Sequence, residues 1–141
     1  MRGPTTKDTD RALALMFEMG RIIRRVMIAR QTLPLPLSYL ETLKFVEEKG
    51  DPVMRDIAAY LRIAAPSATA IIEALVAEKY LARKEDPTDR RLVRLVLSPK
   101  GKRILEKTMR LRTKALRGIM GSLSASDRKE LIRIFSKIVK A

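Results

Sequence analysis

The sequence predicts a mainly helical fold that carries one small, two-stranded β-ribbon. Most of the chain repeats its apolar residues at the spacing that is typical of amphipathic α-helices. Residues 92–97 instead alternate, with Val93, Leu95 and Leu97 on one face, as a half-buried strand does. The tetrapeptide DPTD at residues 86–89 has turn chemistry, because proline fixes φ and aspartate bonds to its own backbone. These observations place a ribbon with a charged tip between helical segments.

Length and composition favour one compact domain with its own hydrophobic core. The chain has 141 residues, of which 46% are hydrophobic, and both values are ordinary for a folded domain. It contains no cysteine and no histidine, which excludes a disulfide framework, a thiolate zinc site and the commonest general base. Carboxylates such as Asp56 and Glu73 belong to no motif with a partner base. We therefore expect neither an enzyme nor a cofactor.

The net charge of +14 favours a polyanionic partner, with nucleic acid as the first candidate. Residues 33–81 hold 5 basic and 7 acidic side chains, whereas residues 82–103 hold 8 basic and 3 acidic ones. The predicted ribbon is thus the densest basic segment. A membrane span is not expected, because no apolar run approaches the roughly 20 residues that a span needs. Binding to a membrane surface is not expected either, because the basic residues are not confined to one amphipathic helix with exposed apolar bulk. The N-terminal stretch MRGPTTKDTD has no signal-peptide core, which favours a cytoplasmic protein.

The first helix is expected from about Asp8 to Gln31, with Thr9 or Asp8 as its cap. Its apolar residues form two stripes, so the helix must be covered on more than one side. This pattern favours pairing with a second copy of the chain, and packing within one domain is the alternative. The first stripe contains Leu13, Phe17, Gly20, Ile23 and Met27, and the second contains Leu15, Met19, Ile22 and Val26.

The middle of the chain has the pattern of a helix-turn-helix. After Pro34 and Pro36, residues 38–41 (SYLE) have the pattern of a capping box that opens a helix ending at Gly50. Two short helices follow, at about 54–61 and 66–78, around the turn at residues 62–64. The second helix of such a pair commonly enters the major groove of DNA.

The C-terminal part is also predicted to be helical. Ser98 is expected to cap a long helix that extends to about Met120, and Ser124 to cap the last helix. The last helix carries an apolar stripe at Leu131, Ile134, Phe135 and Ile138.

This order of elements resembles the MarR-type winged helix-turn-helix transcriptional regulators over nearly the whole chain. The most specific matches are the D-x-R of residues 89–91 and the L-S-x-x-G of residues 97–101. The lead-in to the ribbon, L-x-x-x-K-Y-L-x-R at residues 75–83, also matches, although Lys79 stands where glycine is usual. In this resemblance the ribbon would be the wing, and the helical pair before it would be the helix-turn-helix.

The resemblance implies a homodimer whose N- and C-terminal helices, residues 1–34 and 102–141, interleave with those of the second copy. Residues 35–101 would form the winged helix-turn-helix lobe that binds a pseudo-palindromic double-stranded DNA operator. The expected function is sequence-specific transcriptional regulation, as a repressor that a small-molecule effector of unknown identity relieves. The alternative is an architectural or protein-interaction module of the same fold that binds DNA with little sequence preference.

The resemblance also assigns roles to residues of the wing. Arg91 would enter the minor groove, where a guanidinium favours the negative potential. Asp89 would pair with Arg91 and aim it, whereas Arg90 and Lys84 would contact phosphates.

The recognition helix would contribute Pro66, at its first helical position, together with Ser67 and Thr69. The two hydroxyls have three open roles, namely reading bases, contacting phosphates or capping the helix. Arg62 occupies a turn position where glycine is frequent, and Ala64 replaces a Ser or Thr cap. The segment AAPSATA offers no Arg or Asn for bidentate base contacts, so the wing is expected to supply much of the binding energy.

Overall fold

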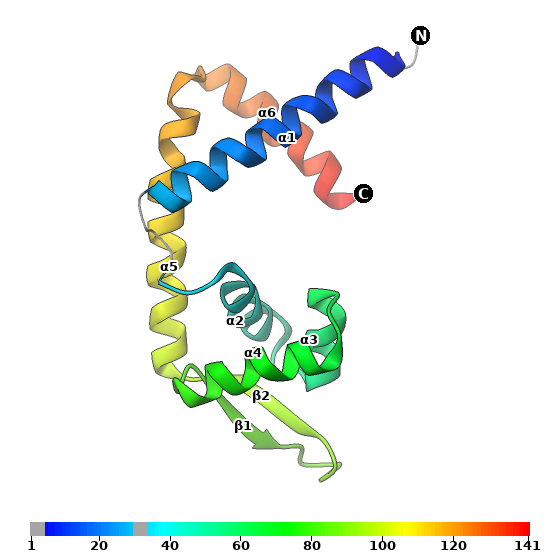
Figure 1. Cartoon of the computed structure of the whole chain (residues 1–141), viewed down its shortest axis with the longest axis vertical. Helices are drawn as coiled ribbons and strands as arrows, with labels where there is room; N and C mark the ends of the chain where they lie inside the picture. Colours follow the sequence, from blue (N-terminus) through cyan, green and yellow to red (C-terminus); the bar gives the residue numbers. More distant parts are fainter. Residues whose placement is uncertain (1–4, 30–33) are drawn as a thin grey trace. The chain divides into compact units, whose positions relative to one another are not determined.

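The computed structural model describes residues 5–29 and 34–141 of the chain (Figure 1). The chain divides into two compact units, one formed by residues 1–32 with 112–141 and the other by residues 33–111. In chain order the elements are α1 (Thr6–Ala29), α2 (Leu37–Lys49), α3 (Met54–Leu61), α4 (Ala65–Ala77), β1 (Leu81–Glu85), β2 (Val93–Leu97), α5 (Pro99–Arg117), the 3-10 helix η1 (Gly118–Ser122) and α6 (Ala125–Lys140). The mainly helical fold with one ribbon is therefore confirmed.

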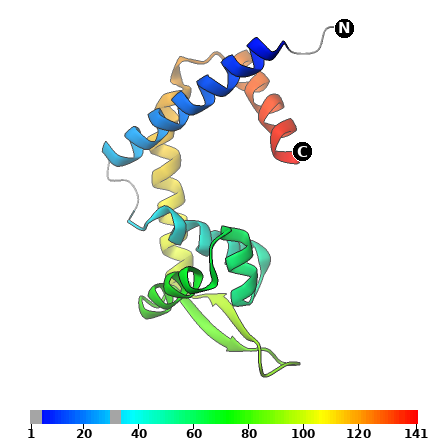
Figure 2. The same ribbon diagram turned by 45° about the vertical axis from the view of Figure 1, so that its right-hand side comes forward.

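The second unit is a lobe in which α2, α3 and α4 and the start of α5 enclose one hydrophobic core. Leu43, Ile57, Ile72 and Leu75 are fully buried there, which matches the helical apolar spacing of their segments. The ribbon contributes to the same core through Leu81 and Leu95 and extends away from the helices (Figures 1 and 2). The core thereby fixes the base of the ribbon beneath α4.

The ribbon is a two-stranded antiparallel sheet whose register pairs Leu81 with Leu97 at the base and Glu85 with Val93 near the tip. The second strand begins at Val93 rather than Leu92, because the Leu92 backbone belongs to the turn: its N–H donates to the Asp89 carbonyl and its carbonyl accepts from Asp86 N–H. Leu95 is buried on the predicted face, but Val93 is 45% exposed because it lies beyond the core.

Helices α3 and α4 form the predicted helix-turn-helix. Arg62 ends α3 in the left-handed region at φ 55° and ψ 44°, and its N–H donates to the carbonyls of Ala58 and Ala59. Helix α4 begins at Ala65, so Pro66 is its second residue rather than its first. Ala64 is the N-cap and provides no side-chain hydrogen bond, as its methyl group requires.

The predicted capping box at Ser38 is wrong. Helix α2 begins at Leu37, two residues before the start that a Ser38 cap implies, and Pro36 is its N-cap with φ −55° and ψ 150°. The Pro36 carbonyl accepts from the N–H groups of Tyr39 and Leu40, so the helix starts without any side-chain cap. Ser38 lies inside the first turn, where its carbonyl accepts from the Thr42 hydroxyl at 2.7 Å.

The other helix ends follow the sequence more closely. Ser98 Oγ accepts from Gly101 N–H at 2.9 Å, and Ser124 Oγ accepts from Asp127 N–H at 3.0 Å, so both predicted caps are confirmed. Helix α1 is capped by Thr5, whose Oγ1 accepts from Asp8 N–H, rather than by Asp8 or Thr9. Its predicted end at Gln31 lies outside the described residues. Helix α5 ends at Arg117, and the chain then tightens into η1 before the predicted end at Met120.

The first unit exposes much apolar surface. Every residue of α1 from Thr6 to Arg25 is exposed, including Phe17 at 75%. Helix α6 exposes Ile138 at 59% and Val139 at 84%. No single helix in the described part of the chain is long and apolar enough to cross a membrane, and only α3 with α4, bent by 113°, passes by length and composition together.

Candidate functional site

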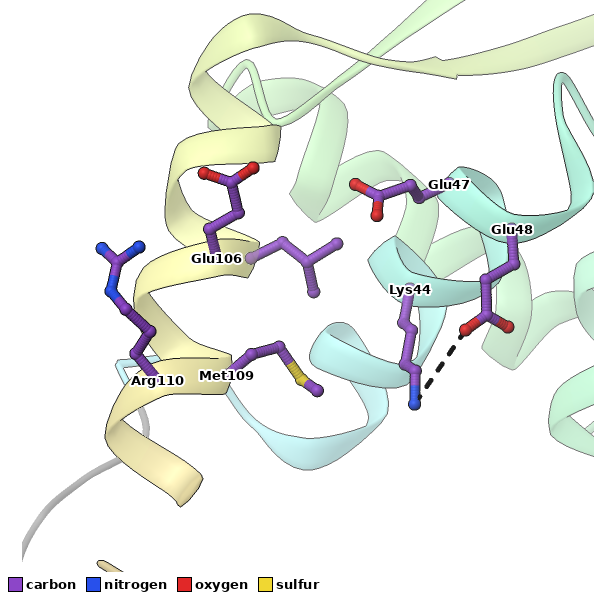
Figure 3. A pocket seen from close by; sticks show the side chains of 7 residues that line it. Lys44, Glu47, Glu48, Glu106, Met109 and Arg110 are labelled. Carbon is purple, nitrogen blue, oxygen red and sulfur yellow. Dashed lines mark ion pairs between the residues drawn. The ribbon is translucent and has the colours of Figure 1, made fainter. Parts of the chain in front are cut away.

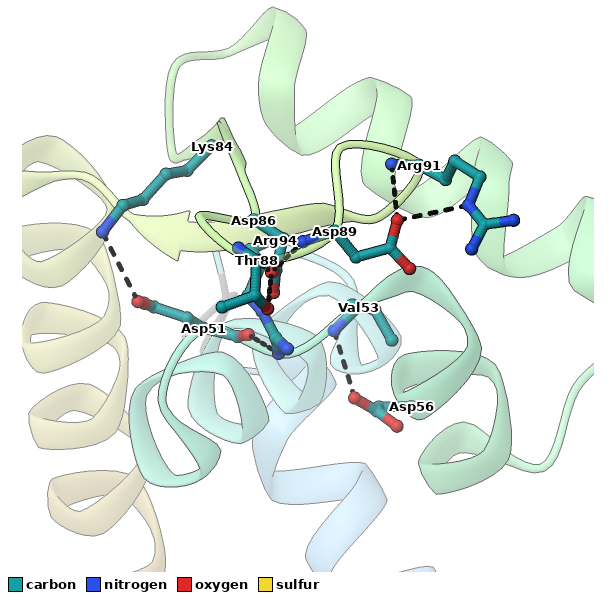
Figure 4. Close-up of polar contacts among 9 residues, drawn as sticks. All are labelled: Asp51, Val53, Asp56, Lys84, Asp86, Thr88, Asp89, Arg91 and Arg94. Carbon is teal, nitrogen blue, oxygen red and sulfur yellow. Dashed lines mark hydrogen bonds and ion pairs between the residues drawn. The ribbon is translucent and has the colours of Figure 1, made fainter.

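The tip of the ribbon is organised around the buried carboxylate of Asp86 (Figure 4). Its Oδ1 atom accepts hydrogen bonds from the Thr88 hydroxyl at 2.7 Å and from the N–H groups of Thr88 and Asp89 at 2.8 and 2.9 Å. Its Oδ2 atom accepts from Arg94 Nε at 2.6 Å. The Thr88 hydroxyl, then Arg94 and the backbone donors, hold the pKa of Asp86 well below its usual range. Asp86 therefore stays ionised and fixes the turn.

Arg94 connects the ribbon to the turn between α2 and α3. Besides its bond to Asp86, its Nη1 donates to the backbone carbonyl of Asp51 at 2.9 Å. Next to it, Leu95 N–H donates to the Pro52 carbonyl at 2.9 Å, and Val53 forms an isolated antiparallel bridge with Arg94. Arg94 is thus a brace between the ribbon and the lobe, not a free cation of the tip.

Arg91 and Asp89 lie together at the outer end of the ribbon. The Arg91 side chain is 91% exposed, and its Nε donates to Asp89 Oδ1 at 3.3 Å. The Arg91 backbone N–H donates to the same oxygen at 3.0 Å. Neither contact uses the terminal nitrogens of the guanidinium, so Asp89 orients the group through Nε alone.

The remaining basic residues of the predicted wing site divide into two groups. Arg90 is exposed beside Arg91. Lys84 reaches in another direction, and its Nζ is 3.9 Å from Asp51 Oδ2 (Figure 4). The structure therefore brings Asp89, Arg90 and Arg91 together, whereas the Lys84 side chain lies beside Asp51 in the turn between α2 and α3.

Helix α4 exposes all three of its predicted site residues, Pro66, Ser67 and Thr69. The Thr69 hydroxyl donates to the Ala65 carbonyl at 2.9 Å, which leaves its oxygen lone pairs as acceptors. The residue between them, Ala68, is fully buried and points into the core. The exposed face of the helix is consequently small and only weakly polar at its N-terminal end.

An ion pair that no sequence motif indicates joins α4 to the ribbon. Arg83 Nη2 on β1 donates to Glu73 Oε1 on α4, and both side chains remain about half exposed. The matched pattern around residue 83 marks the arginine, but nothing in the sequence indicates which carboxylate crosses to it. Helix α4 packs on β1 in the lobe, and this packing sets the pair.

A hollow of about 290 Å³ lies on the same lobe between α2 and α5 (Figure 3). Its apolar lining comes from Leu105 and Met109, and its rim is charged. Lys44 is paired with Glu48 across 4.0 Å at this rim. The hollow is open and small, near the lower size of ligand pockets in proteins.

Comparison with known proteins agrees with this geometry. The model of the MarR family matches residues 33–92, which include α2, α3, α4, β1 and the wing tip. YsmB of Bacillus subtilis, an HTH-type transcriptional regulator, is 30% identical over 95 residues, which are 67% of this chain. The match spans 62% of the length of YsmB. The chain belongs to the MarR family.

Solved structures show the same winged helix-turn-helix fold over the entire chain. A MarR family protein from Bacillus stearothermophilus superimposes with a TM-score of 0.78 at 20% identity, covering 99% of this chain and 96% of the other. BpsR of Bordetella bronchiseptica superimposes with a TM-score of 0.67 at 24% identity, covering 100% and 99%. In this MarR family fold, α3 and α4 are the helix-turn-helix and the β1–β2 ribbon is the wing.

Proposed function

We propose that this chain is a dimeric, double-stranded-DNA-binding transcriptional regulator. Helix α4 lies in the major groove through Pro66, Ser67 and Thr69, and the wing inserts Arg91 into the adjacent minor groove. Arg90 and Lys84 bind phosphates, which adds affinity and salt dependence but no sequence information. The regulator acts in the cytoplasm as a repressor. The MarR family is one of transcriptional regulators rather than enzymes, which supports a binding function.

The observation that carries this proposal is the oriented arginine at the wing tip. Arg91 is almost fully exposed, yet Asp89 restrains it through both Nε and the backbone N–H. An exposed arginine loses considerable side-chain entropy on binding, and restraint before binding reduces that loss. The Asp86–Arg94 brace fixes the strand beneath it, so the arginine is held at a set distance from α4.

The dimer is proposed from the uncovered apolar faces of α1 and α6. Residues 1–34 and 102–141 would supply these faces to a second copy, and residues 35–101 would form one DNA-binding lobe per subunit. The exposed side chains of α1 include Leu13, Met16, Phe17 and Ile22, and those of α6 include Ile132, Phe135 and Ile138. An area of this kind on a single chain favours association, because isolated proteins seldom expose large continuous apolar patches.

The effector is proposed to be a small molecule that binds the hollow between α2 and α5. BpsR, which shares this fold, has its DNA binding regulated by 6-hydroxynicotinic acid. Here the charged rim contains both signs, with Lys44 and Arg110 against Glu47, Glu48 and Glu106. The rim alone therefore selects no ligand charge.

The second candidate is a coating protein with the same fold and little sequence preference. The observation that favours it is the bare N-terminal surface of α4, where Ala64, Ala65 and Ala70 offer no polar group to the bases. The two candidates differ in the ratio of specific to non-specific affinity. A regulator is expected to prefer its site roughly a thousandfold or more, and a coating protein almost not at all.

Selection of bound fragments from a pool of random duplex DNA, repeated at two salt concentrations, tests the proposal. Enrichment of a pseudo-palindrome with half-sites about one helical turn apart supports it. Failure to bind duplex DNA at either salt concentration removes the function altogether, and binding without enrichment favours the coating protein.

Replacement of Arg91 then tests the wing. Arg91→Ala is expected to weaken binding to the selected site by about tenfold or more, or roughly 1.4 kcal/mol. Lys107→Ala, which removes one charge from the exposed face of α5, is the control and is expected to change binding much less. The variants Ser67→Ala and Thr69→Ala measure the share of the binding energy that α4 supplies. A larger loss from these hydroxyls than from Arg91 would show that the helix, not the wing, supplies most of the binding energy.

A further inference from the structure

The exposed face of α4 extends beyond its three predicted site residues. Pro66, Thr69, Ala70 and Glu73 are all exposed, and their spacing of three and four places them along one side of the helix. Within α4, which is described in full, Glu73 is the only charged residue. It is also the longest polar side chain on that side. Thus the side of α4 that faces the groove in the proposed complex carries one acid and no base.

Such a carboxylate opposes binding to a polyanion unless a cation neutralises it. Arg83 provides that cation from β1, through a hydrogen bond from Nη2 to Glu73 Oε1. The contact occupies one carboxylate oxygen, while the side chain of Glu73 stays 58% exposed and that of Arg83 44% exposed. The pair is therefore open to solvent on the same lobe surface as Thr69.

A contribution to stability alone explains the Glu73–Arg83 ion pair poorly. Exposed ion pairs contribute about 0–1 kcal/mol, and an apolar contact between α4 and β1 is already supplied by the core. An ionised carboxylate has a specific use in the major groove, because it accepts a hydrogen bond from the N4 amino group of cytosine. The small side chains at Ala65 and Ala70 allow the helix to approach the bases closely enough for this longer side chain to reach one.

We propose that Glu73 reads a cytosine in each half-site, with Arg83 as the positioning residue that neutralises and orients its carboxylate. This inference rests on the proposed function and gives the bare recognition helix a base-reading group. Oε2 is the acceptor for the cytosine amino group, and Oε1 keeps its bond to Arg83. The preference for C·G at that base pair is on the order of tenfold, the lower part of the range for direct base contacts.

The test compares the sequence preferences of Glu73 variants after selection from random duplex DNA. Glu73→Gln keeps an oxygen for Arg83 but presents an amide, which pairs with adenine, so the preferred base at one position of each half-site is expected to change from C to A. Glu73→Ala is expected to leave that position without preference while the rest of the motif persists. Glu78→Gln, which removes the same charge from the exposed C-cap of α4, is the matched control and should keep the wild-type motif.

Each outcome decides between defined alternatives. If all three variants give the wild-type motif, Glu73 contacts no base and serves only as a structural partner of Arg83. If the wild-type motif has no preferred C·G pair in its half-sites, the inference is wrong although the DNA-binding function stands. If the wild-type protein enriches no motif, the proposed function fails and this inference with it. Thermal unfolding of each variant, which is expected to match wild type because Glu73 is exposed, excludes misfolding as the cause of a lost preference.

Discussion

Asp86 Oδ2 accepts a hydrogen bond from Arg94 Nε at 2.6 Å, and Arg94 in turn donates to the Asp51 carbonyl at 2.9 Å. The two side chains connect three segments, namely the wing tip, the strand β2 and the turn between α2 and α3. The wing therefore has a second attachment to the lobe in addition to the apolar contacts of Leu81 and Leu95. These two attachments fix the wing on the lobe, and a fixed wing is what allows its outer end to hold Arg91 in place.

The stability that Asp86 contributes is expected to depend on pH. Since hydrogen bonds lower the pKa of Asp86 in the folded chain, its contribution is complete above the ordinary pKa of about 3.9 and is lost as the pH falls toward the folded value. Asp86→Asn should therefore be less stable than wild type at pH 7, and the difference should shrink between about pH 5 and pH 3. Urea unfolding at fixed protein concentration measures it, with the exposed neighbour Glu85→Gln as control. A difference that stays constant with pH would contradict the assigned role.

Gly101 is expected to tolerate no side chain. A Cβ atom at this position would overlap the carbonyl oxygen of Tyr80 and lie 2.9 Å from its carbonyl carbon, and neither backbone atom can rotate away. Gly101→Ala should destabilise the chain by about 2 kcal/mol or more, in spite of the better helix propensity of alanine. Gly118→Ala, where a Cβ meets nothing within 4 Å, is the control and should be neutral or slightly stabilising. Thermal unfolding of the two variants at equal concentration is the measurement, and equal stabilities would mean that the backbone at Tyr80 shifts to make room for the Cβ atom.

The folded chain is expected to be more stable with glycine in place of Arg62. The residue has φ 55°, in the left-handed region, where a side chain costs roughly 1–2 kcal/mol and glycine costs nothing sterically. Glycine loses about 0.5–1 kcal/mol through the greater freedom of the unfolded chain, so Arg62→Gly should gain roughly 0.5 kcal/mol. Ala59→Gly, on the exposed side of α3, should lose about 1 kcal/mol. Loss of stability in both variants would show that the Arg62 side chain makes compensating interactions.

Local signals in the sequence predicted the helix-turn-helix, the ribbon and the caps at Ser98 and Ser124, because each depends on residues within a few positions. The same reasoning failed at Ser38. There a capping-box pattern competed with Pro36, whose backbone already had the conformation of an N-cap, and the proline determined the start. Local chemistry predicts a cap well only where one candidate is present.

The candidate site was predicted in part, for the same reason. Asp89 and Arg91 are two residues apart, so their contact was visible as a motif. Arg94 with Asp51 spans 43 positions, and Arg83 with Glu73 joins a strand to a helix. Such pairs depend on how the elements pack, and a single sequence does not encode that packing in its periodicity.

The apolar face of α1 stays exposed to solvent in a single chain. Phe17 is 75% exposed and Ile23 is 36% exposed, on one stripe of a helix whose described side chains are nowhere buried. A helix with such stripes gains most of its stability from packing against a partner rather than from intrinsic propensity.

Polar replacement of Phe17 and Ile23 together is expected to disrupt a dimer of this chain. The double variant Phe17→Ser and Ile23→Ser removes two large apolar groups, each of which contributes roughly 1.5–3 kcal/mol when fully buried, so the dimer should dissociate or α1 should unfold. Sedimentation velocity over a range of concentrations measures the first effect, and circular dichroism measures the second.

Val93→Ser, an equally simple change at a 45% exposed residue of the wing, should leave the oligomeric state unchanged. An unperturbed dimer in the double variant would exclude this face of α1 from the interface, whereas a monomeric wild type at all concentrations would exclude the dimer itself. Because two lobes reading one pseudo-palindrome bind more tightly than one, the double variant should also lose affinity for the selected DNA even though no wing or α4 residue has changed.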